Sequence, residues 1–322
     1  MSDWLLIDGA RRLLADTCTH DVVQAAEADG WCPLVWDALE QAGYGSLSEL
    51  APADALAVLT VAGEHAAPVP LAEATLAGWL LGQAPVGTAS VPVAGELRLD
   101  GDRLSGTVRV PWGRVVERVV AVADGQAVTV ATASAGRIER HANIAGEPRD
   151  RLVFEGAPAE DVRPAACDLR ERGALARSAQ MAGALAGMAR LSVAYAGERR
   201  QFGRPIAAFQ AVQQHLVLIA QESCLAGAAV EGAASTLGAF EIAAAKAAVS
   251  RAAVTATRSA HQVHGAMGMT QEYRLHHFSR RLWAWRSEFG DEQHWASELG
   301  RALHRAGAEQ LYPAITGTAP VG

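Results

Sequence analysis

The sequence predicts a mainly helical protein with a central β domain: an N-terminal helical domain, a small antiparallel β-barrel or sandwich, and a C-terminal helical bundle. Three observations carry this prediction. Apolar residues recur at helical spacing up to residue 81, the apolar period falls to two between about residues 86 and 162, and Ala-rich segments with long apolar faces follow. We therefore expect domains at 1–84, 85–165 (a contracted β domain) and 166–322.

Glycines and prolines divide the first domain into short helices. One is predicted to begin near Pro70 and to end before Gly82, as helix-terminus preferences indicate. Aromatic side chains bury large areas. We therefore expect the four tryptophans of this region to be core or interface anchors: Trp4, Trp31, Trp36 and Trp79.

The β domain is marked by frequent turn signals between short runs of alternating residues. Asp100-Gly101-Asp102 and Asp124-Gly125 are typical of tight hairpin turns. The bundle that follows is predicted as five helices, over residues 169–197, 207–237, 239–263, 275–285 and 292–308. Their apolar surface exceeds what one bundle can hide, which predicts a large oligomer interface.

Composition excludes several classes of protein. A formal charge of −7 and a pI near 5.8 provide no basic field for nucleic acid. We expect no membrane insertion and a cytoplasmic location, because we find neither an uninterrupted apolar span nor a signal-peptide pattern at the N-terminus. The scattered cysteines are expected to be reduced core thiols: Cys18, Cys32, Cys167 and Cys224.

No metal site is predicted. The histidines of the last third lack metal-ligand spacing with a carboxylate on one helical face, so we interpret them as solvated or interface groups: His261, His264, His276, His277 and His294. The basic residues Arg280, Arg281 and Arg286 are interpreted as structural ion-pair partners.

Residues 195–214 read as the end of one helix, a tight loop and the start of the next helix. Gly203 permits a backbone angle that other residues rarely adopt, and Pro205 suits the first turn of a helix. Cationic and amide side chains surround this turn: Arg199, Arg200, Gln201, Gln210 and Gln213. Such forked donors suit an anionic ligand with planar edges, for example a dinucleotide pyrophosphate.

Two blocks of the chain resemble the C-terminal-domain signature of acyl-CoA dehydrogenases. The first covers residues 198–206 with Phe209-Gln210, and the second covers residues 262–268 with Glu272-Tyr273. The order helix, β domain, helical bundle is also the domain order of that family. The resemblance therefore covers nearly the whole chain, although it is strong only in the last third.

The resemblance implies an FAD that lies across a subunit interface, with its pyrophosphate and adenine half held by the C-terminal domain of the neighbouring subunit. The matching positions in this chain are Arg199, Gln201, Phe202, Gln210, Gln262 and Gly265. A guanidinium suits a pyrophosphate, and a glycine turn lets backbone N–H groups approach it. One departure is Ala266, where the family has a second glycine.

The parts of the family's site that contact the flavin ring are not matched. Residues 83–90 lack the family's acidic and Gly-Ser-Asp elements, and its Trp-Ile-Thr positions hold Val110, Pro111 and Trp112. A tryptophan can stack on a flavin ring, but we interpret Trp112 as a core or interface residue.

The catalytic base that the family uses for α-proton abstraction is also not matched. Phe289 falls at the usual glutamate position, and Glu288 lies one residue early. Because proton abstraction requires placement at hydrogen-bond distance, we favour a solvated or structural role for Glu288. The family's alternative base position falls near Gly173, which has no side chain, and Glu171 is out of register.

The resemblance thus implies a short degenerate subunit of a heteromeric (α2β2) acyl-CoA dehydrogenase, similar to those of bacterial steroid side-chain degradation. Such a subunit would share FAD with a catalytic partner that desaturates a steroid or other bulky acyl-CoA and passes electrons to an acceptor such as electron-transfer flavoprotein. Two alternatives remain open. One is a self-sufficient homo-oligomer with Glu288 as a displaced base, and the other is a non-catalytic scaffold without FAD.

Overall fold

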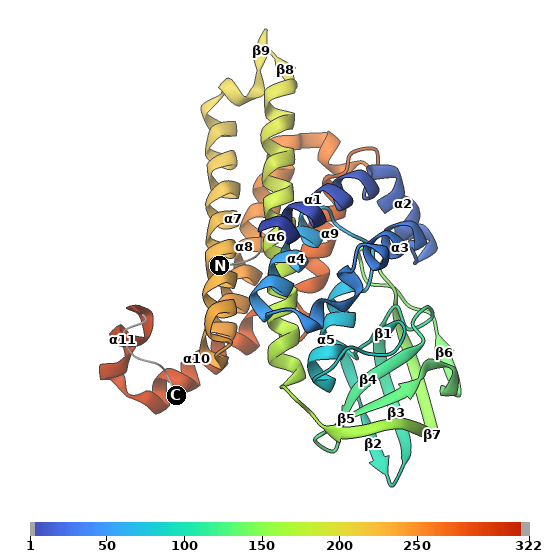
Figure 1. The fold of residues 1–322 in the computed structure, drawn as a ribbon. Helices are drawn as coiled ribbons and strands as arrows, with labels where there is room; N and C mark the ends of the chain where they lie inside the picture. The colour runs from blue at the N-terminus through green and yellow to red at the C-terminus, as the bar shows by residue number, and fades with distance from the viewer. Residues whose placement is uncertain (1–3, 317–322) are drawn as a thin grey trace.

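The computed structural model describes residues 4–316 and confirms the expected fold class. Long helices form one side of the molecule, and shorter N-terminal helices and a β-barrel lie against them (Figure 1). The secondary structure changes from helix to strand between Leu81 and Ala89, and back to helix between Pro164 and Leu169.

The N-terminal helices are short, as the glycines and prolines predict, and they pack around a common core. They are α1 (Trp4–Thr17), α2 (His20–Asp29), α3 (Pro33–Gln41), the 3-10 helix η1 (Tyr44–Glu49), α4 (Pro52–Glu64) and α5 (Leu71–Leu81). Trp36 is buried. Trp4 is 68% exposed, so it is not a core residue of this chain, and its role as an interface anchor stays a prediction.

The central domain is a closed barrel with a core of aliphatic side chains around Phe154. Its strands are β1 (Ala89–Ser90), β2 (Ala94–Asp100), β3 (Arg103–Pro111), β4 (Arg118–Ala123), β5 (Gln126–Ala131), β6 (Arg137–Glu139) and β7 (Arg149–Pro164). The β2–β3 and β4–β5 hairpins turn at the two predicted Asp-Gly sites. Pairing closes the ring in the order β4-β2-β3-β7-β5-β4.

One feature of the barrel differs from the antiparallel prediction. Strand β4 pairs in parallel with both β1 and β2. The alternation of apolar residues fixes which face of a strand is buried, but not the direction of its neighbour. Short-range patterns therefore predicted the hairpins and missed these two non-local pairings.

The C-terminal region contains the long helices of the fold. They are α6 (Leu169–Glu198), α7 (Gln210–Thr236), α8 (Ala239–His264), α9 (Leu275–Trp285) and α10 (Glu292–Ala306), with the 3-10 helices η3 (Ile206–Ala208), η4 (Gly265–Met269) and η5 (Ala308–Gln310) and the short α11 (Leu311–Thr316). A two-stranded hairpin, β8 (Arg200–Gln201) and β9 (Arg204–Pro205), joins α6 to α7 and projects from the end of the bundle (Figure 1).

Glycines allow α4 and α6 to cross almost backbone to backbone. A Cβ atom on Gly63 would lie 2.0 Å from the carbonyl oxygen of Gln180, and one on Gly183 would lie 1.8 Å from that of Thr60. Glycine weakens a helix interior by about 1 kcal/mol relative to alanine. Here that cost is offset by close packing of the N-terminal helices on the bundle.

Helix α7 leaves much of its apolar surface exposed. Val217 is 53% exposed and Leu225 is 44% exposed, although the helix packs along α6 and α8. By length and composition alone, α7 could also span a membrane: its mean hydropathy is 1.3 over an 18-residue window, of which 22% is buried. This differs from our expectation that the sequence contains no apolar span. A single such helix is weak evidence for a span. The exposed face is also what a protein partner would cover.

Candidate functional site

The β8–β9 hairpin turns through two residues with left-handed backbone. Phe202 has φ 50° and Gly203 has φ 78°, which is the pattern of a two-residue type I′ turn. The Phe202 side chain is 91% exposed. Pro205 belongs to β9 and precedes a 3-10 turn, so our expectation that it begins the long helix is wrong, and α7 begins at Gln210.

A cavity of about 390 Å³ lies between this hairpin and the end of α8. Five of the six predicted cofactor contacts line it: Arg199, Gln201, Phe202, Gln262 and Gly265. The sixth, Gln210, is not among the lining residues, although the adjacent Phe209 is. The fold therefore brings together two sequence blocks that are separated along the chain by most of α7 and α8.

Arg199 gives the cavity a donor for an anion, and Gly265 keeps the neighbouring backbone free of a side chain. Arg199 caps α6 by donating its backbone N–H to the Tyr195 carbonyl at 2.8 Å, and its side chain is exposed with no partner among residues 4–316. Gly265 ends α8 at φ 56° and ψ −136°, a conformation open essentially to glycine alone. Its own N–H donates to the His261 carbonyl, so Gly265 contributes the absence of a side chain rather than a free amide.

Aromatic rings pack together at the end of α8, directly before Gly265. The rings of Tyr195 and His264 are stacked with centroids 4.5 Å apart, and Tyr273 contacts both. The Tyr195 hydroxyl donates to the His264 carbonyl at 3.3 Å. Burial lowers the pKa of His264, so its ring is neutral at pH 7 and donates from Nδ1 to the Ala260 carbonyl.

A second, larger cleft of about 1160 Å³ lies between the barrel and the segment after α9. Strands β2, β3 and β4 form one wall, and residues 287–294 with the start of α6 form the other. Phe289 lines this cleft with φ 57°, and its ring covers Gly173. Residues 173 and 289, which match the family's two base positions, are therefore in contact, and neither carries a carboxylate.

Glu288 lies behind this cleft and is fixed by two arginines. Its Oε1 accepts from Arg149 Nε and its Oε2 accepts from Arg177 Nε, each at 2.7 Å. Its side chain is only 10% exposed. Burial opposes ionisation, but the two guanidiniums outweigh it and lower the pKa of Glu288 to about 2. Such a carboxylate has its oxygens occupied and is a poor proton acceptor.

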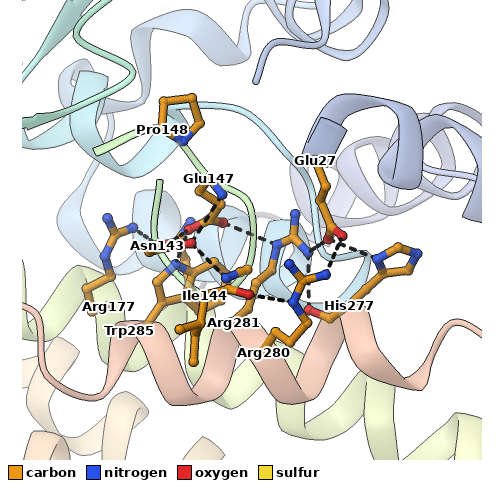
Figure 2. Close-up of polar contacts among 12 residues, drawn as sticks. Glu27, Asn143, Ile144, Glu147, Pro148, Arg177, His277, Arg280, Arg281 and Trp285 are labelled. Atoms are coloured by element: carbon orange, nitrogen blue, oxygen red, sulfur yellow. Dashed lines mark hydrogen bonds and ion pairs between the residues drawn. The ribbon is translucent and has the colours of Figure 1, made fainter. Parts of the chain in front are cut away.

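These arginines belong to a buried ionic network that joins all three regions of the chain (Figure 2). Arg177 of α6 also pairs with Glu73 of α5, and Arg149 pairs with Glu147 in the barrel. The Glu147 carboxylate accepts from Trp285 at 2.9 Å and lies 3.2 Å from Arg281 of α9. Replacing one member of a buried pair typically costs about 3–5 kcal/mol. The network therefore anchors the 286–291 segment.

Several other predicted roles can be compared with the structure. Trp112 is 2% exposed beneath the Arg149 guanidinium, which confirms the core interpretation. The ion-pair interpretation of the basic residues is also confirmed, since Arg280 and Arg281 pair with Glu27 and Arg286 pairs with Glu292. All four cysteines are free, but Cys224 is exposed, so it is not a core thiol.

Sequence reasoning missed the network and the histidine cluster at its edge. The missed network residues include Glu73, Glu147, Arg149 and Arg177. One signal was present: Glu73 is the one charged residue of the apolar helix α5. A lone charge in such a helix predicts a buried partner, but the sequence alone does not identify that partner.

Comparison with known proteins identifies the family. Residues 170–303 match the model of the acyl-CoA dehydrogenase C-terminal domain. The chain is 29% identical over 297 residues to acyl-CoA dehydrogenase IpdE2 of Mycobacterium tuberculosis, covering 86% of this chain and 89% of that protein. Residues 170–303 therefore belong to the acyl-CoA dehydrogenase family, and the likeness to IpdE2 extends over most of the chain.

Solved structures agree with this assignment at the level of the fold. The ChsE4-ChsE5 complex from Mycobacterium tuberculosis matches with a TM-score of 0.82 at 22% identity, over 94% of this chain and 97% of that chain. The Tcur3481-Tcur3483 steroid ACAD matches with a TM-score of 0.81 at 23% identity, with the same coverage of each chain.

Proposed function

We propose that this chain is a subunit of a heteromeric, flavin-dependent acyl-CoA dehydrogenase and that it supplies the pyrophosphate and adenine half of an FAD site to a catalytic partner. One contrast carries the proposal. The cavity beside the β8–β9 hairpin keeps a free cation, amides and a glycine turn, whereas the positions for a base hold Gly173 and Phe289.

The residues around the hairpin fit the half of FAD that we assign to them. Arg199 would pair with the pyrophosphate through its planar fork, and the residues that follow Gly265 in η4 would offer backbone N–H groups. Gln201 and Gln262 offer amides to the adenosine. When bound, FAD would accept the hydride removed from the β-carbon of an acyl-CoA whose α-proton the partner abstracts.

The large cleft does not fit an independent catalytic site. Glu96, Asp168 and Asp291 line it together with Arg170, which gives an acidic surface toward a polyanionic cofactor or thioester. Phe289 occupies the base position, and no carboxylate in the described chain lies at that position with a free oxygen. A complete catalytic subunit in an α2β2 assembly would supply what this cleft lacks.

Two further observations support a partner of the same family. Proteins of similar fold include the ChsE4-ChsE5 complex and the Tcur3481-Tcur3483 steroid ACAD, each named for two components. The exposed apolar face of α7 begins beside the half-site. We extend the proposal to a steroid or other bulky acyl-CoA, to an acceptor such as electron-transfer flavoprotein, and to a cytoplasmic location.

The test is co-expression with a candidate catalytic acyl-CoA dehydrogenase subunit from the same organism, followed by visible spectroscopy of the purified complex. We expect a colourless lone chain and a yellow complex, and Arg199→Ala should lose FAD. Arg251→Ala is the matched control, because Arg251 is an exposed arginine of α8 outside the cavity. FAD retained in Arg199→Ala at wild-type occupancy would contradict the shared site.

The same purified proteins also distinguish the two alternative functions. Stoichiometric flavin and turnover from the lone chain would establish the homo-oligomeric enzyme, for which Glu288 would have to leave both arginines. A complex that forms without any flavin would establish the scaffold. The ion pairs of Glu288 disfavour the first alternative, and the free Arg199 side chain disfavours the second.

A further inference from the structure

Three histidines from two distant parts of the chain meet where the N-terminal helices contact α9. His20 is the first residue of α2, and His276 and His277 lie in the first turn of α9. The rings of His276 and His277 have centroids 4.0 Å apart, and those of His20 and His277 are 5.0 Å apart. His20 Nδ1 lies 2.9 Å from His277 Nε2.

The Nδ1 atoms of His276 and His277 already donate hydrogen bonds, which fix the orientation of both rings. His277 Nδ1 donates to the Glu27 carboxylate at 2.9 Å (Figure 2), and His276 Nδ1 donates to the Tyr273 carbonyl at 2.9 Å. Histidines that ligate metals are oriented by such bonds to a carboxylate or a backbone carbonyl. Both Nε2 atoms are therefore acceptors, and that of His277 accepts from His20 Nδ1, so a metal ion at these two nitrogens requires the His20 proton to move to Nε2.

We propose that His20, His276 and His277 form a binding site for a divalent transition-metal ion such as Zn²⁺, with Glu27 as the carboxylate that orients His277. One ligand atom from each of Glu27, His276 and His277 already lies within 4.8 Å of the others. The site would join the N-terminal helices to the bundle at a position away from the cavity beside the hairpin.

The His20–His277 pair requires only a small movement, whereas the His276 ring, whose centroid lies 6.0 Å from that of His20, must bring its Nε2 toward the same ion. Two nitrogens bound to Zn²⁺ at about 2.0–2.1 Å in tetrahedral geometry lie about 3.3 Å apart. The His20 and His277 nitrogens must therefore separate by a few tenths of an ångström from their present 2.9 Å. His277 is 2% exposed and fixed, whereas His20 is half-buried and lies at a helix start, so His20 is the side chain that moves.

The charges around the cluster decide which ligands it offers. Arg280 and Arg281 both pair with Glu27, so this carboxylate is neutralised and serves as an orienting group rather than a direct ligand. The cluster thus presents imidazole nitrogens, which suit Zn²⁺, Co²⁺, Ni²⁺ and Cu²⁺ but not Mg²⁺ or Ca²⁺. Water would complete the coordination at the half-exposed side of His20.

The test is metal binding by the full chain, without a histidine tag, in its complex with the partner or alone. Titration with Zn²⁺ followed by calorimetry should give one site, and Co²⁺ should produce the visible bands of tetrahedral coordination. His20→Ala and His276→Ala should each weaken Zn²⁺ binding at least tenfold. His141→Ala and His304→Ala, which change exposed histidines elsewhere, should leave it unchanged.

Two outcomes would overturn the proposal. The first is an absence of stoichiometric Zn²⁺ binding, which would make the cluster a hydrogen-bonded pair of histidines beside a third. The second is binding that survives in both His20→Ala and His276→Ala. Circular dichroism of each variant establishes that it folds, and His20→Gln, which keeps a hydrogen-bonding side chain at the helix start, repeats the test if alanine does not fold.

Discussion

The ring of Phe289 fills the space that a side chain on Gly173 would need: a Cβ atom built on Gly173 would lie 2.3 Å from Phe289 Cδ1. The two positions at which related enzymes place a base therefore exclude one another's side chains in this chain. A carboxylate cannot be introduced at residue 173 unless residue 289 is also made smaller.

This contact predicts a coupled effect on stability. Gly173→Ala forces the added methyl group against the Phe289 ring, and overpacking of this kind costs about 1–3 kcal/mol. In the Gly173→Ala/Phe289→Leu double variant the cost should be smaller than the sum of the single effects. Urea unfolding of the four proteins measures this coupling.

Gly227→Ala provides the matched control for that series. No heavy atom lies within 4 Å of a Cβ added there, and the site is within helix α7. The control should be neutral or stabilising by about 1 kcal/mol because alanine favours helix. Additive effects of Gly173→Ala and Phe289→Leu would show that the two positions do not compete for space.

Replacing Glu288 should destabilise the chain rather than abolish a chemical step. Glu288→Gln leaves Arg149 and Arg177 without their shared carboxylate, and breaking a buried pair in this way costs about 3–5 kcal/mol. Turnover per folded complex should stay within a few-fold of wild type. A loss of several orders of magnitude in kcat, with the fold intact, would restore Glu288 as the base.

The Glu288 contribution also has a defined pH range. The two guanidiniums lower its pKa from 4.5 to about 2 against the effect of burial. The stability that this shift provides is fully present above about pH 4.5 and is lost as the pH falls toward 2. The difference in unfolding free energy between wild type and Glu288→Gln should therefore shrink below pH 4.5, and a constant difference would argue against the shift.

Lys246 predicts a pH dependence at the alkaline end. Its ammonium group is buried in α8 and donates to the Trp285 carbonyl at 2.8 Å, and burial lowers its pKa from 10.5 to about 7. Between these values the unfolded chain binds more protons, so the unfolding free energy should rise with pH.

The matched comparison is Lys246→Met, which keeps the length of the side chain and removes the titrating group. Chemical unfolding at several pH values between 7 and 10 should show a rising stability for wild type relative to the variant. Parallel curves over that range would indicate that Lys246 is charged in the folded chain.

A substitution at Phe202, in the type I′ turn of the β8–β9 hairpin, should have different effects on stability and on cofactor binding. Asn-Gly is the favoured sequence for such a turn, whereas a phenylalanine with φ 50° is strained. Phe202→Asn should therefore keep or raise the melting temperature while it weakens FAD retention in the complex. Val86→Asn, which changes another exposed apolar side chain, should leave FAD unchanged. Equal FAD retention in both variants would remove Phe202 from the proposed site.

Local patterns predicted much of the fold. The predicted helix over 275–285 has the bounds of α9, and the two Asp-Gly turns lie at the tips of hairpins, because caps, turns and periodicity act within a few residues. The parallel pairings of β4 and the late start of α7 were not predicted. Both depend on contacts between distant segments, which a short-range pattern does not encode.

In the candidate site, too, the sequence predicted some residues but not the contacts between distant segments. The resemblance selected Arg199 and Gln262, and the structure places both beside one cavity. The partners of Glu288 could not be predicted, because Arg149 and Arg177 come from different regions and carry no shared spacing. The position of His20 beside His277 likewise depends on how α2 docks on α9.

The buried ionic network has a consequence for any attempt to divide the molecule. A fragment cut near residue 84 would leave Arg177 without Glu73, and a fragment that begins near residue 166 would also lose Arg149 and Glu147. Each cut would expose apolar surface and also leave a buried charge without its counter-ion. We therefore expect the three regions to unfold in one cooperative transition, with no separately stable module that recombination could exchange.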